Sequence, residues 1–527
     1  MWGRSLFFIF TWTIEMTKEK YLNQLLEVIG VLRGPESDVA RKHLQAYESN
    51  HTVNRRKMFE LYKFIKINEI RDYDKLKKRI SPDSTDDSFN KLIRRTIERV
   101  QESLIVDVNI RRKGSYSDIF RVKFFLRKQL MQAQILMGRG LSLRSLELYS
   151  SILRNAKKFE LYDVVLEALY YKQLIQTNSV GSKYFEDIER EIEYYEDCRQ
   201  FLRSSQKLRA KLTSQGIVKS QSLASLNDFE ERIEQLVKYF EQTKSSNIQS
   251  IYYLLKMDLE RAKGNSVHLL IKEFIVLLET SPAIYSKVRI SYMNNELAVA
   301  LLNELRFVEA KNSLEGFDKQ DGSFALIDVI IIITHFKIII LLGELGGIAS
   351  IVGRLEVRGV FEKFKLQSSI IVYYQSVSKF LQRDYSDSLQ LLQSKNEIEK
   401  DKEGWNVWIR IMRLLCSIEM LKLNLIDYDI ESFRKYLERT SKQFEVRERD
   451  KLVLRVLMDL DRSSYDFKLT SKEVEADLQK LKSTDKKYAW NPDSPELILF
   501  HDWFECKRLN KDYKPNFEIY REAMRKD

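Results

Sequence analysis

The sequence predicts an all-α protein: a right-handed solenoid of helix hairpins preceded by a basic N-terminal helical domain. The chain of 527 residues has only 17 Gly and 6 Pro, where average usage would give roughly 37 and 26. No proline lies between Pro82 and Pro282, or between Pro282 and Pro492. Because proline breaks helix interiors and glycine weakens them, these stretches favour helix after helix. A chain of this length also exceeds the size of one core, which favours several domains or a stacked array.

Residues 1–15 stand apart from the predicted fold. Ser5–Ile14 is apolar and follows Arg4, as in a signal peptide, but no small-x-small cleavage site comes after it. Met16 then opens an ordinary helical sequence. We interpret residues 1–15 as an upstream extension and Met16 as the initiator, with a weak signal or anchor segment as the alternative.

Residues 16–108 are predicted to form a basic domain of four or five short helices. Asn54–Asn68 carries apolar residues at helical spacing. A loop rich in N-cap residues follows Pro82 and precedes a helix over Phe89–Val106. Residues 109–117 are the predicted hinge, and residues 118–527 the predicted array.

The array begins with the helix pair Arg121–Gly138 and Leu141–Phe159. Small and aromatic residues recur there at fixed steps: Ala133, Leu136, Gly140, Ser145, Tyr149 and Ile152. Asn295–Phe317 repeats the pattern through Leu297, Ala298, Leu301, Phe307, Glu309, Ala310 and Leu314. Phe380–Leu392 repeats its second half through Tyr385, Ser388 and Leu392, although Lys379 occupies a normally apolar step. Trp405–Leu423 and Asp427–Thr440 have the lengths of a fourth pair.

On these residues the chain resembles tetratricopeptide-repeat proteins, with degenerate repeats that lack the family's proline at the end of each repeat. An irregular α-helical array unrelated to that family is the alternative. The resemblance implies a concave groove, lined by the first helix of each hairpin, that binds extended peptides or partner helices. It would place these residues in the groove: Arg127, Gln134, Met137, Tyr292, Asn295, Val299 and Asn303.

Two further segments are ambiguous in sequence. Phe324–Leu342 is long enough to span a bilayer, but it contains Asp328 and Lys337, each costing about 2.5–3.5 kcal/mol near a membrane centre. We predict a buried central helix and no membrane span. Lys183–Ala262 has interrupted apolar stripes, which favour antiparallel hairpins over a coiled coil.

No catalytic or metal-binding motif stands out, so we expect neither enzymatic activity nor a cofactor or metal. The five histidines are scattered, and Gly343–Gly347 follows an apolar helix without a strand, which favours a helix C-cap and turn. Cys198, Cys416 and Cys506 are far apart, without CxxC spacing, which favours a cytoplasmic location.

Positive charge is concentrated near the N-terminus: residues 16–130 contain 26 Lys+Arg against 16 Asp+Glu. Our first hypothesis is a non-catalytic scaffold that binds a protein or peptide. The alternative is a nucleic-acid-associated regulator whose basic helices contact phosphate, although Asp72–Ile80 lacks the glycine of a helix-turn-helix turn. Its candidate contacts are Arg55, Arg56, Lys57, Lys77, Lys78, Arg79, Arg111, Arg112 and Lys113. A helical enzyme with an unseen site is a third possibility, and the sequence leaves the oligomeric state open.

Overall fold

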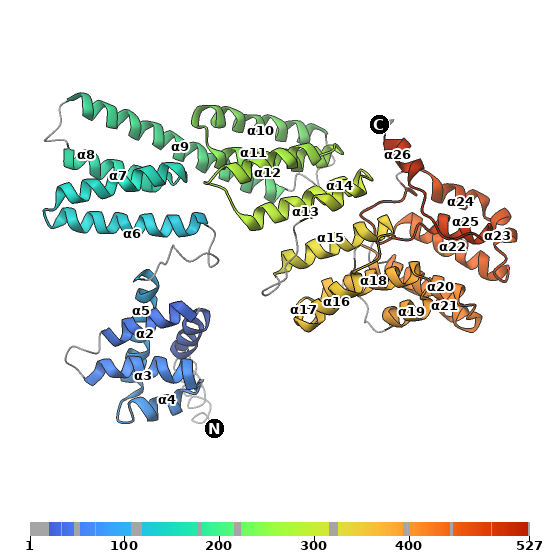
Figure 1. Ribbon diagram of the computed structural model, residues 1–527, viewed down its shortest axis with the longest axis horizontal. Helices are drawn as coiled ribbons and strands as arrows, with labels where there is room; N and C mark the ends of the chain where they lie inside the picture. The colour runs from blue at the N-terminus through green and yellow to red at the C-terminus, as the bar shows by residue number, and fades with distance from the viewer. Residues whose placement is uncertain are drawn as a thin grey trace, which may run out of the picture. The chain divides into compact units, whose positions relative to one another are not determined.

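In the part of the chain that the computed structural model describes, every regular element is a helix and there is no strand (Figure 1). The all-α prediction is therefore confirmed, whereas the right-handed solenoid stays a prediction. The structure describes residues 20–32, 34–46, 53–68, 70–106, 118–176, 182–215, 223–315, 325–393, 398, 401, 403–442, 446–485 and 487–524. The predictions for residues 1–15 and for the 109–117 hinge fall outside these ranges.

The chain divides into two compact units, Met1–Gln200 and Phe201–Asp527. The first unit begins with a helical segment over residues 20–31. Its further helices are α2 (Gly34–Ala46), α3 (Val53–Asn68), α4 (Tyr73–Ile80), α5 (Asp86–Val106), α6 (Asp118–Gly138), α7 (Ser142–Lys158), α8 (Tyr162–Gln176) and the first part of α9 (Ser182–Gln215).

The second unit contains the end of α9 and all later helices. They are α10 (Leu223–Thr243), α11 (Ser246–Lys263), α12 (His268–Thr280), α13 (Lys287–Asn303), α14 (Phe307–Asn312), α15 (Leu326–Leu342), α16 (Ile348–Val357), α17 (Val360–Lys363), α18 (Lys365–Leu381), α19 (Tyr385–Gln393), α20 (Trp405–Glu419), α21 (Leu423–Thr440), α22 (Glu448–Arg462), α23 (Phe467–Glu473), α24 (Glu475–Lys482), α25 (Phe500–Arg508) and α26 (Glu518–Met524).

The boundary between the units falls inside α9, so the predicted array over 118–527 is divided between them. One hydrophobic cluster joins α6, α7, α8 and the first part of α9, and another joins the end of α9 to α10 and α11. The basic domain has a core of its own, built from residues 22–100 and centred on buried Leu25, Leu61 and Phe89. Two residues connect α10 to α11, which pack against each other as a hairpin, as the interrupted stripes predict.

The three predicted repeat hairpins close with the same turn, which also joins α7 to α8 and α20 to α21. A residue with positive φ ends the turn: Gly140 between α6 and α7 (φ 80°), Leu305 between α13 and α14 (φ 59°), and Arg383 between α18 and α19 (φ 66°). In each case the amide of the next residue donates to the carbonyl five residues before it, at 2.9 to 3.0 Å. This pattern satisfies carbonyls at the helix end and reverses the chain.

In each predicted repeat hairpin, a small residue lies seven positions before the positive-φ residue and another lies five positions after it. The pairs are Ala133 with Ser145, Ala298 with Ala310, and Ser376 with Ser388, and all six residues are fully buried. The Ser145 hydroxyl donates to the Ala133 carbonyl at 2.7 Å, and Ser388 donates to the Ser376 carbonyl at 2.9 Å. The two helices of each hairpin therefore approach closely where the sequence pattern predicts small-residue contacts. Nearby, Lys379 forms ion pairs with Asp384 and Asp387 at 2.8 and 3.1 Å. These pairs explain why a lysine is tolerated at a position that is apolar in the repeat pattern.

Replacing Ala298 with leucine is expected to lower the free energy of unfolding by about 1–3 kcal/mol, because the added atoms have no space between the two helices. Val308→Leu is the control, since Val308 is 61% exposed on α14. Urea unfolding followed by circular dichroism measures both variants. Equal midpoints for the two would show that the small-residue contact does not set the hairpin spacing.

The apolar segment predicted as a buried helix is α15. Isoleucine is a moderate helix former, so burial on all sides stabilises this helix more than its local propensity does. Asp328 accepts a hydrogen bond from the Ala325 amide at 2.8 Å near its first turn, and Gly343, at φ 75°, ends it as predicted. None of the helices in the described ranges is long and apolar enough to cross a membrane.

Candidate protein-interaction face

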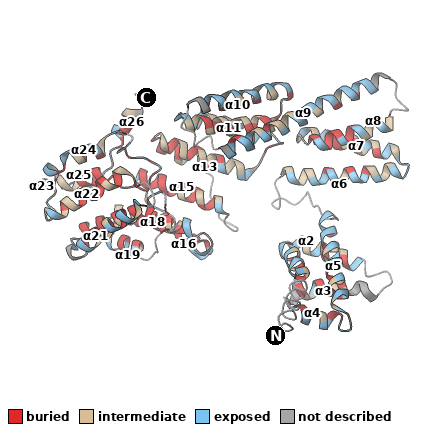
Figure 2. Cartoon of the chain, turned by 180° about the vertical axis from the view of Figure 1, so that it is seen from behind, coloured by how far each residue is buried: buried red, intermediate tan, exposed pale blue. Residues whose placement is uncertain are grey.

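Helix α6 exposes an apolar stripe in addition to the one that it buries. Phe120, Phe124, Met131 and Ile135 are 45 to 54% exposed and lie on one side of the helix at helical spacing. Figure 2 shows much of α6 in pale blue. The buried side of the same helix carries Leu126, Leu130 and Ala133, which pack in the local core. A surface helix normally has one apolar stripe, so the second calls for a function.

Helix α8 continues this surface beside α6. Its exposed positions are Asp163, Glu167, Tyr170 and Leu174, again at helical spacing. The Gln134 side chain of α6 donates to Glu167 Oε1 at 2.7 Å and joins the two helices. We call the combined surface the α6–α8 face, and it consists of Phe120, Phe124, Arg127, Met131, Ile135, Glu167, Tyr170 and Leu174.

The charge of α6 is almost entirely positive. Asp118 is its only carboxylate, against Arg121, Lys123, Arg127 and Lys128. The side chains of Lys123 and Arg127 make no hydrogen bond or ion pair with any described residue. On α8, the Tyr170 hydroxyl donates to Glu196, and this hydrogen bond raises the pKa of Tyr170. Unused positive charge therefore borders the apolar stripe on the α6 side.

The structure brings together two of the predicted groove residues of the first unit. Arg127 lies on the α6–α8 face, and Gln134 lies at its seam with α8. Met137 is half-buried at the end of α6. The sequence reasoning missed Phe120, Phe124, Met131 and Ile135, although four apolar residues at helical spacing beside a complete core stripe could have revealed them.

The other predicted groove residues lie on α13 in the second unit, and not all are accessible. Tyr292 is 44% exposed and Val299 is half-buried. Asn295 is only 3% exposed, because it lies on the side of α13 that faces the core. It therefore cannot contact a partner in this structure. Asn303 donates to Asp493 Oδ2 at 2.8 Å and is thus engaged within its own unit.

The predicted nucleic-acid contacts are partly engaged within the basic domain. Lys57 donates to the Ser81 hydroxyl at 3.0 Å, and Lys77 pairs with Asp86 at 2.7 Å. The Arg79 guanidinium lies 4.8 Å from the centre of the Phe64 ring, and Lys78 is exposed. The side chains of Arg55 and Arg56, and residues Arg111, Arg112 and Lys113, fall outside the described part.

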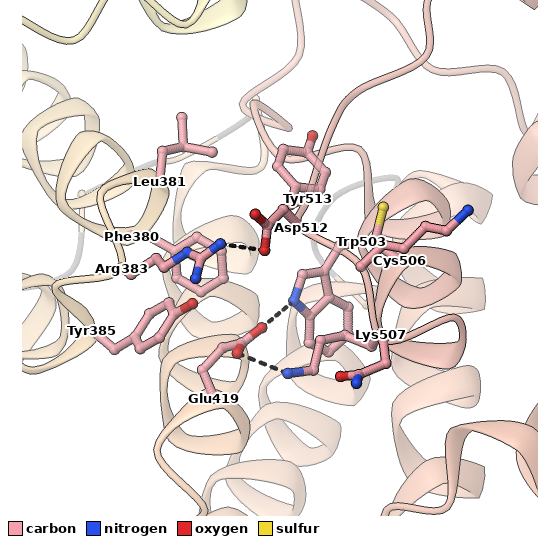
Figure 3. A pocket seen from close by; sticks show the side chains of 12 residues that line it. Phe380, Leu381, Arg383, Tyr385, Glu419, Trp503, Cys506, Lys507, Asp512 and Tyr513 are labelled. Atoms are coloured by element: carbon pink, nitrogen blue, oxygen red, sulfur yellow. Dashed lines mark hydrogen bonds and ion pairs between the residues drawn. The ribbon is translucent and has the colours of Figure 1, made fainter.

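The second unit contains a pocket of about 370 Å³ near its C-terminal helices (Figure 3). Glu419 lies at its base and accepts from Trp503 Nε1 at 2.8 Å and from Lys507 Nζ at 2.9 Å. Across the mouth, Arg383 forms an ion pair with Asp512. The remaining lining residues are Phe380, Leu381, Tyr385, Cys506, Asn510, Lys511 and Tyr513.

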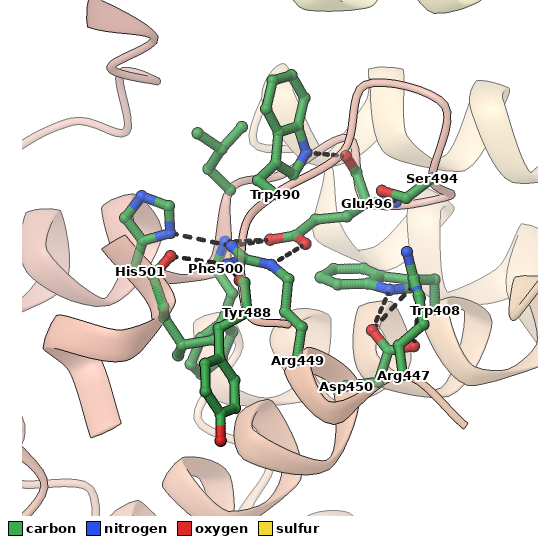
Figure 4. A network of polar contacts seen from close by, with 12 residues as sticks. Trp408, Arg447, Arg449, Asp450, Tyr488, Trp490, Ser494, Glu496, Phe500 and His501 are labelled. Carbon is green, nitrogen blue, oxygen red and sulfur yellow. Dashed lines mark hydrogen bonds and ion pairs between the residues drawn. The ribbon is translucent and has the colours of Figure 1, made fainter. Parts of the chain in front are cut away.

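A buried ion pair lies elsewhere in the second unit, at Arg449 and Glu496 (Figure 4). Arg449 donates from Nε and Nη2 to the two Glu496 oxygens at 2.6 and 2.8 Å, and from Nη1 to the Leu481 and Tyr488 carbonyls, both at 2.7 Å. Its Nη2 also lies 3.2 Å from His501 Nδ1, which must accept because arginine only donates. Burial and this guanidinium hold the pKa of His501 well below its usual range. The pair therefore ties α22 to the segment before α25.

A second buried carboxylate, Asp450, directly follows Arg449 in α22. Arg447 donates to both of its oxygens at 2.9 Å, and Trp408 Nε1 donates to Oδ1 at 3.0 Å. Burial raises the pKa of Asp450, and the Arg447 charge opposes that effect. Because protein donors already contact both oxygens, we interpret Asp450 as part of a structural clamp.

Comparison of the chain with protein-family models, with curated proteins and with solved structures found no match.

Proposed function

We propose that this chain is a non-catalytic interaction scaffold of the cytoplasm, a right-handed solenoid of tetratricopeptide-like hairpins that binds a partner protein. The observation that carries the proposal is the exposed apolar stripe of α6, on a helix that already buries another stripe in its own core. Exposing four large apolar side chains on one stripe serves no purpose for stability, whereas it is typical of a docking surface.

The shape and charge of the α6–α8 face indicate an amphipathic helix as the occupant. Phe120 and Ile135 are fifteen residues apart, so the stripe is about 22 Å long, enough for four helical turns of a partner. A partner helix would place its apolar side on the stripe and carboxylates opposite Lys123 and Arg127. Complementary charge would then favour a partner helix whose carboxylates lie along the α6 side, away from Glu167 of α8.

Replacing both Phe124 and Met131 with glutamate is expected to weaken partner capture at least thirtyfold, since losing central apolar contacts costs 2 kcal/mol or more. The measurement is quantitative capture from a native lysate treated with nuclease, using the full chain, this double variant and Leu143→Glu. Leu143 is 82% exposed on α7, outside the α6–α8 face, and supplies a matched control.

The proposal requires that one protein is captured by the unaltered chain and by Leu143→Glu, but not by the double variant. Circular dichroism must show the same helix content for all three. Equal capture by the double variant would contradict the docking face. Loss of all capture after nuclease treatment would favour the nucleic-acid hypothesis instead.

A further inference from the structure

We propose that the pocket at Glu419 and Trp503 binds an organic carboxylate with an apolar body, carried by a small molecule or by the C-terminus of a peptide. This site lies in the second unit and does not depend on the α6–α8 face. Its volume of about 370 Å³ falls at the lower end of small-ligand sites, which span roughly 300–1,000 Å³.

The lining of the pocket carries one more positive than negative side chain. Its charged lining comprises three cations, Arg383, Lys507 and Lys511, and two carboxylates, Glu419 and Asp512. An ammonium has three N–H groups, and Lys507 directs one to Glu419. The Lys511 side chain has no hydrogen bond or ion pair to any described residue. Unused donors of positive charge therefore favour an anionic ligand.

The base of the pocket argues against a cationic ligand. The Glu419 side chain is only 10% exposed and already accepts from Trp503 and Lys507. Burial, together with the charge of Glu419, raises the pKa of the neighbouring Tyr385 to about 12, so this hydroxyl stays protonated and adds no negative charge. Glu419 thus holds the pocket together and leaves Asp512 as the one accessible carboxylate of the lining.

The ion pair between Arg383 and Asp512 at the mouth of the pocket can break with little loss of free energy. The Arg383 and Asp512 side chains are 63% and 83% exposed, and ion pairs so exposed contribute at most about 1 kcal/mol. A ligand carboxylate can replace Asp512 on Arg383 and form two parallel N–H···O bonds with the guanidinium. Asp512 then returns to water.

Aromatic side chains form the apolar wall. Phe380 and Tyr385 contact each other edge to face, with ring centres 5.2 Å apart. The Trp503 ring is fixed by its hydrogen bond to Glu419 and by Phe467, whose ring centre is 5.7 Å away. This rigid wall suits a ligand whose carboxylate adjoins a ring or a branched alkyl group.

The test is isothermal titration of the full chain with two probe pairs. 3-Phenylpropionate is compared with 3-phenylpropionamide, and the tripeptide Ala-Ala-Phe with a free C-terminus is compared with its amidated form. We expect at least one acid to bind at least tenfold more tightly than its amide, because only the acid pairs with Arg383 and Lys511. Tighter binding of the peptide identifies a peptide C-terminus as the source, and tighter binding of 3-phenylpropionate identifies a small molecule.

The variant Arg383→Gln combined with Lys511→Gln is expected to weaken binding of the preferred acid at least tenfold, whereas Lys514→Gln leaves it unchanged. Lys514 is an exposed neighbour outside the lining, and thermal melting verifies that both variants fold. Equal binding of acid and amide overturns the proposal. Undiminished affinity in the double variant, or no binding of any probe at millimolar concentrations, overturns it as well.

Discussion

Replacing Glu496 with alanine is expected to lower the free energy of unfolding of the second unit by about 3–5 kcal/mol. Glu496 is fully buried and is the only carboxylate that contacts Arg449 among the described residues, while Arg449 itself is 2% exposed. Removing the carboxylate leaves the buried guanidinium without the ion-pair partner that contacts it. The loss would reflect this unpaired charge rather than the net contribution of the pair.

Urea unfolding followed by tryptophan fluorescence measures this effect. Within the described ranges every tryptophan lies in the second unit, at positions 405, 408, 490 and 503. Glu518→Ala is the matched control, since Glu518 pairs with Arg521 at the surface and should cost at most about 1 kcal/mol. Arg449→Met combined with Glu496→Leu should recover most of the loss. Similar losses for Glu496→Ala and Glu518→Ala would show that the buried ion pair of Arg449 and Glu496 does not stabilise the second unit.

Replacing Lys337 with methionine is expected to raise the free energy of unfolding at pH 7 by about 3 kcal/mol. Lys337 is 8% exposed in α15, and its side chain makes no hydrogen bond or ion pair with a described residue. Burial lowers its pKa from 10.5 to about 8, and the partial compensation by Asp493 and Glu403 does not prevent this. Methionine has a similar length and carries no charge into the core.

The stability advantage of Lys337→Met is expected to decrease as pH rises. Between pH 8 and 10.5 the unfolded chain keeps the Lys337 proton while the folded protein has released it, so the unaltered protein gains stability as pH rises. The variant lacks this gain, and its advantage should shrink across that range. Chemical unfolding at pH 7, 9 and 10.5 measures it, with Lys272→Met as the exposed control. An advantage that is constant with pH would show that packing, and not the charge, causes it.

The sequence predicted the helices and hairpin turns well because both depend on local patterns. Glycine and proline scarcity indicated helices, and the spacing of Ala298 with Ala310 and of Ala133 with Ser145 indicated close helix pairs. The burial of α15 was predictable because charged residues interrupt an otherwise apolar segment. The boundary between the two units within α9 was not predictable. A continuous helix has no local sequence signal that shows where its contacts pass from one hydrophobic cluster to the next.

The sites were harder to predict because they join residues far apart in the chain. Arg449 and Glu496 are 47 positions apart, and Glu419 meets Lys507 across 88 positions. Sequence spacing alone cannot predict that residues so far apart are in contact, because the contact depends on the tertiary fold. Asn295 was predicted to be accessible but is buried, because the sequence does not show which polar residue of α13 faces the core.

The most direct test of the α6–α8 face is site-specific photo-crosslinking in living cells. A photoreactive phenylalanine derivative replaces Met131 in one variant and Leu143 in another, since both side chains are well exposed on neighbouring helices. We expect the Met131 variant alone to crosslink one protein, through an acidic amphipathic helix of that protein, with a yield that nuclease does not change. The same products from both positions, or none from Met131, would contradict a docking face on α6 and α8.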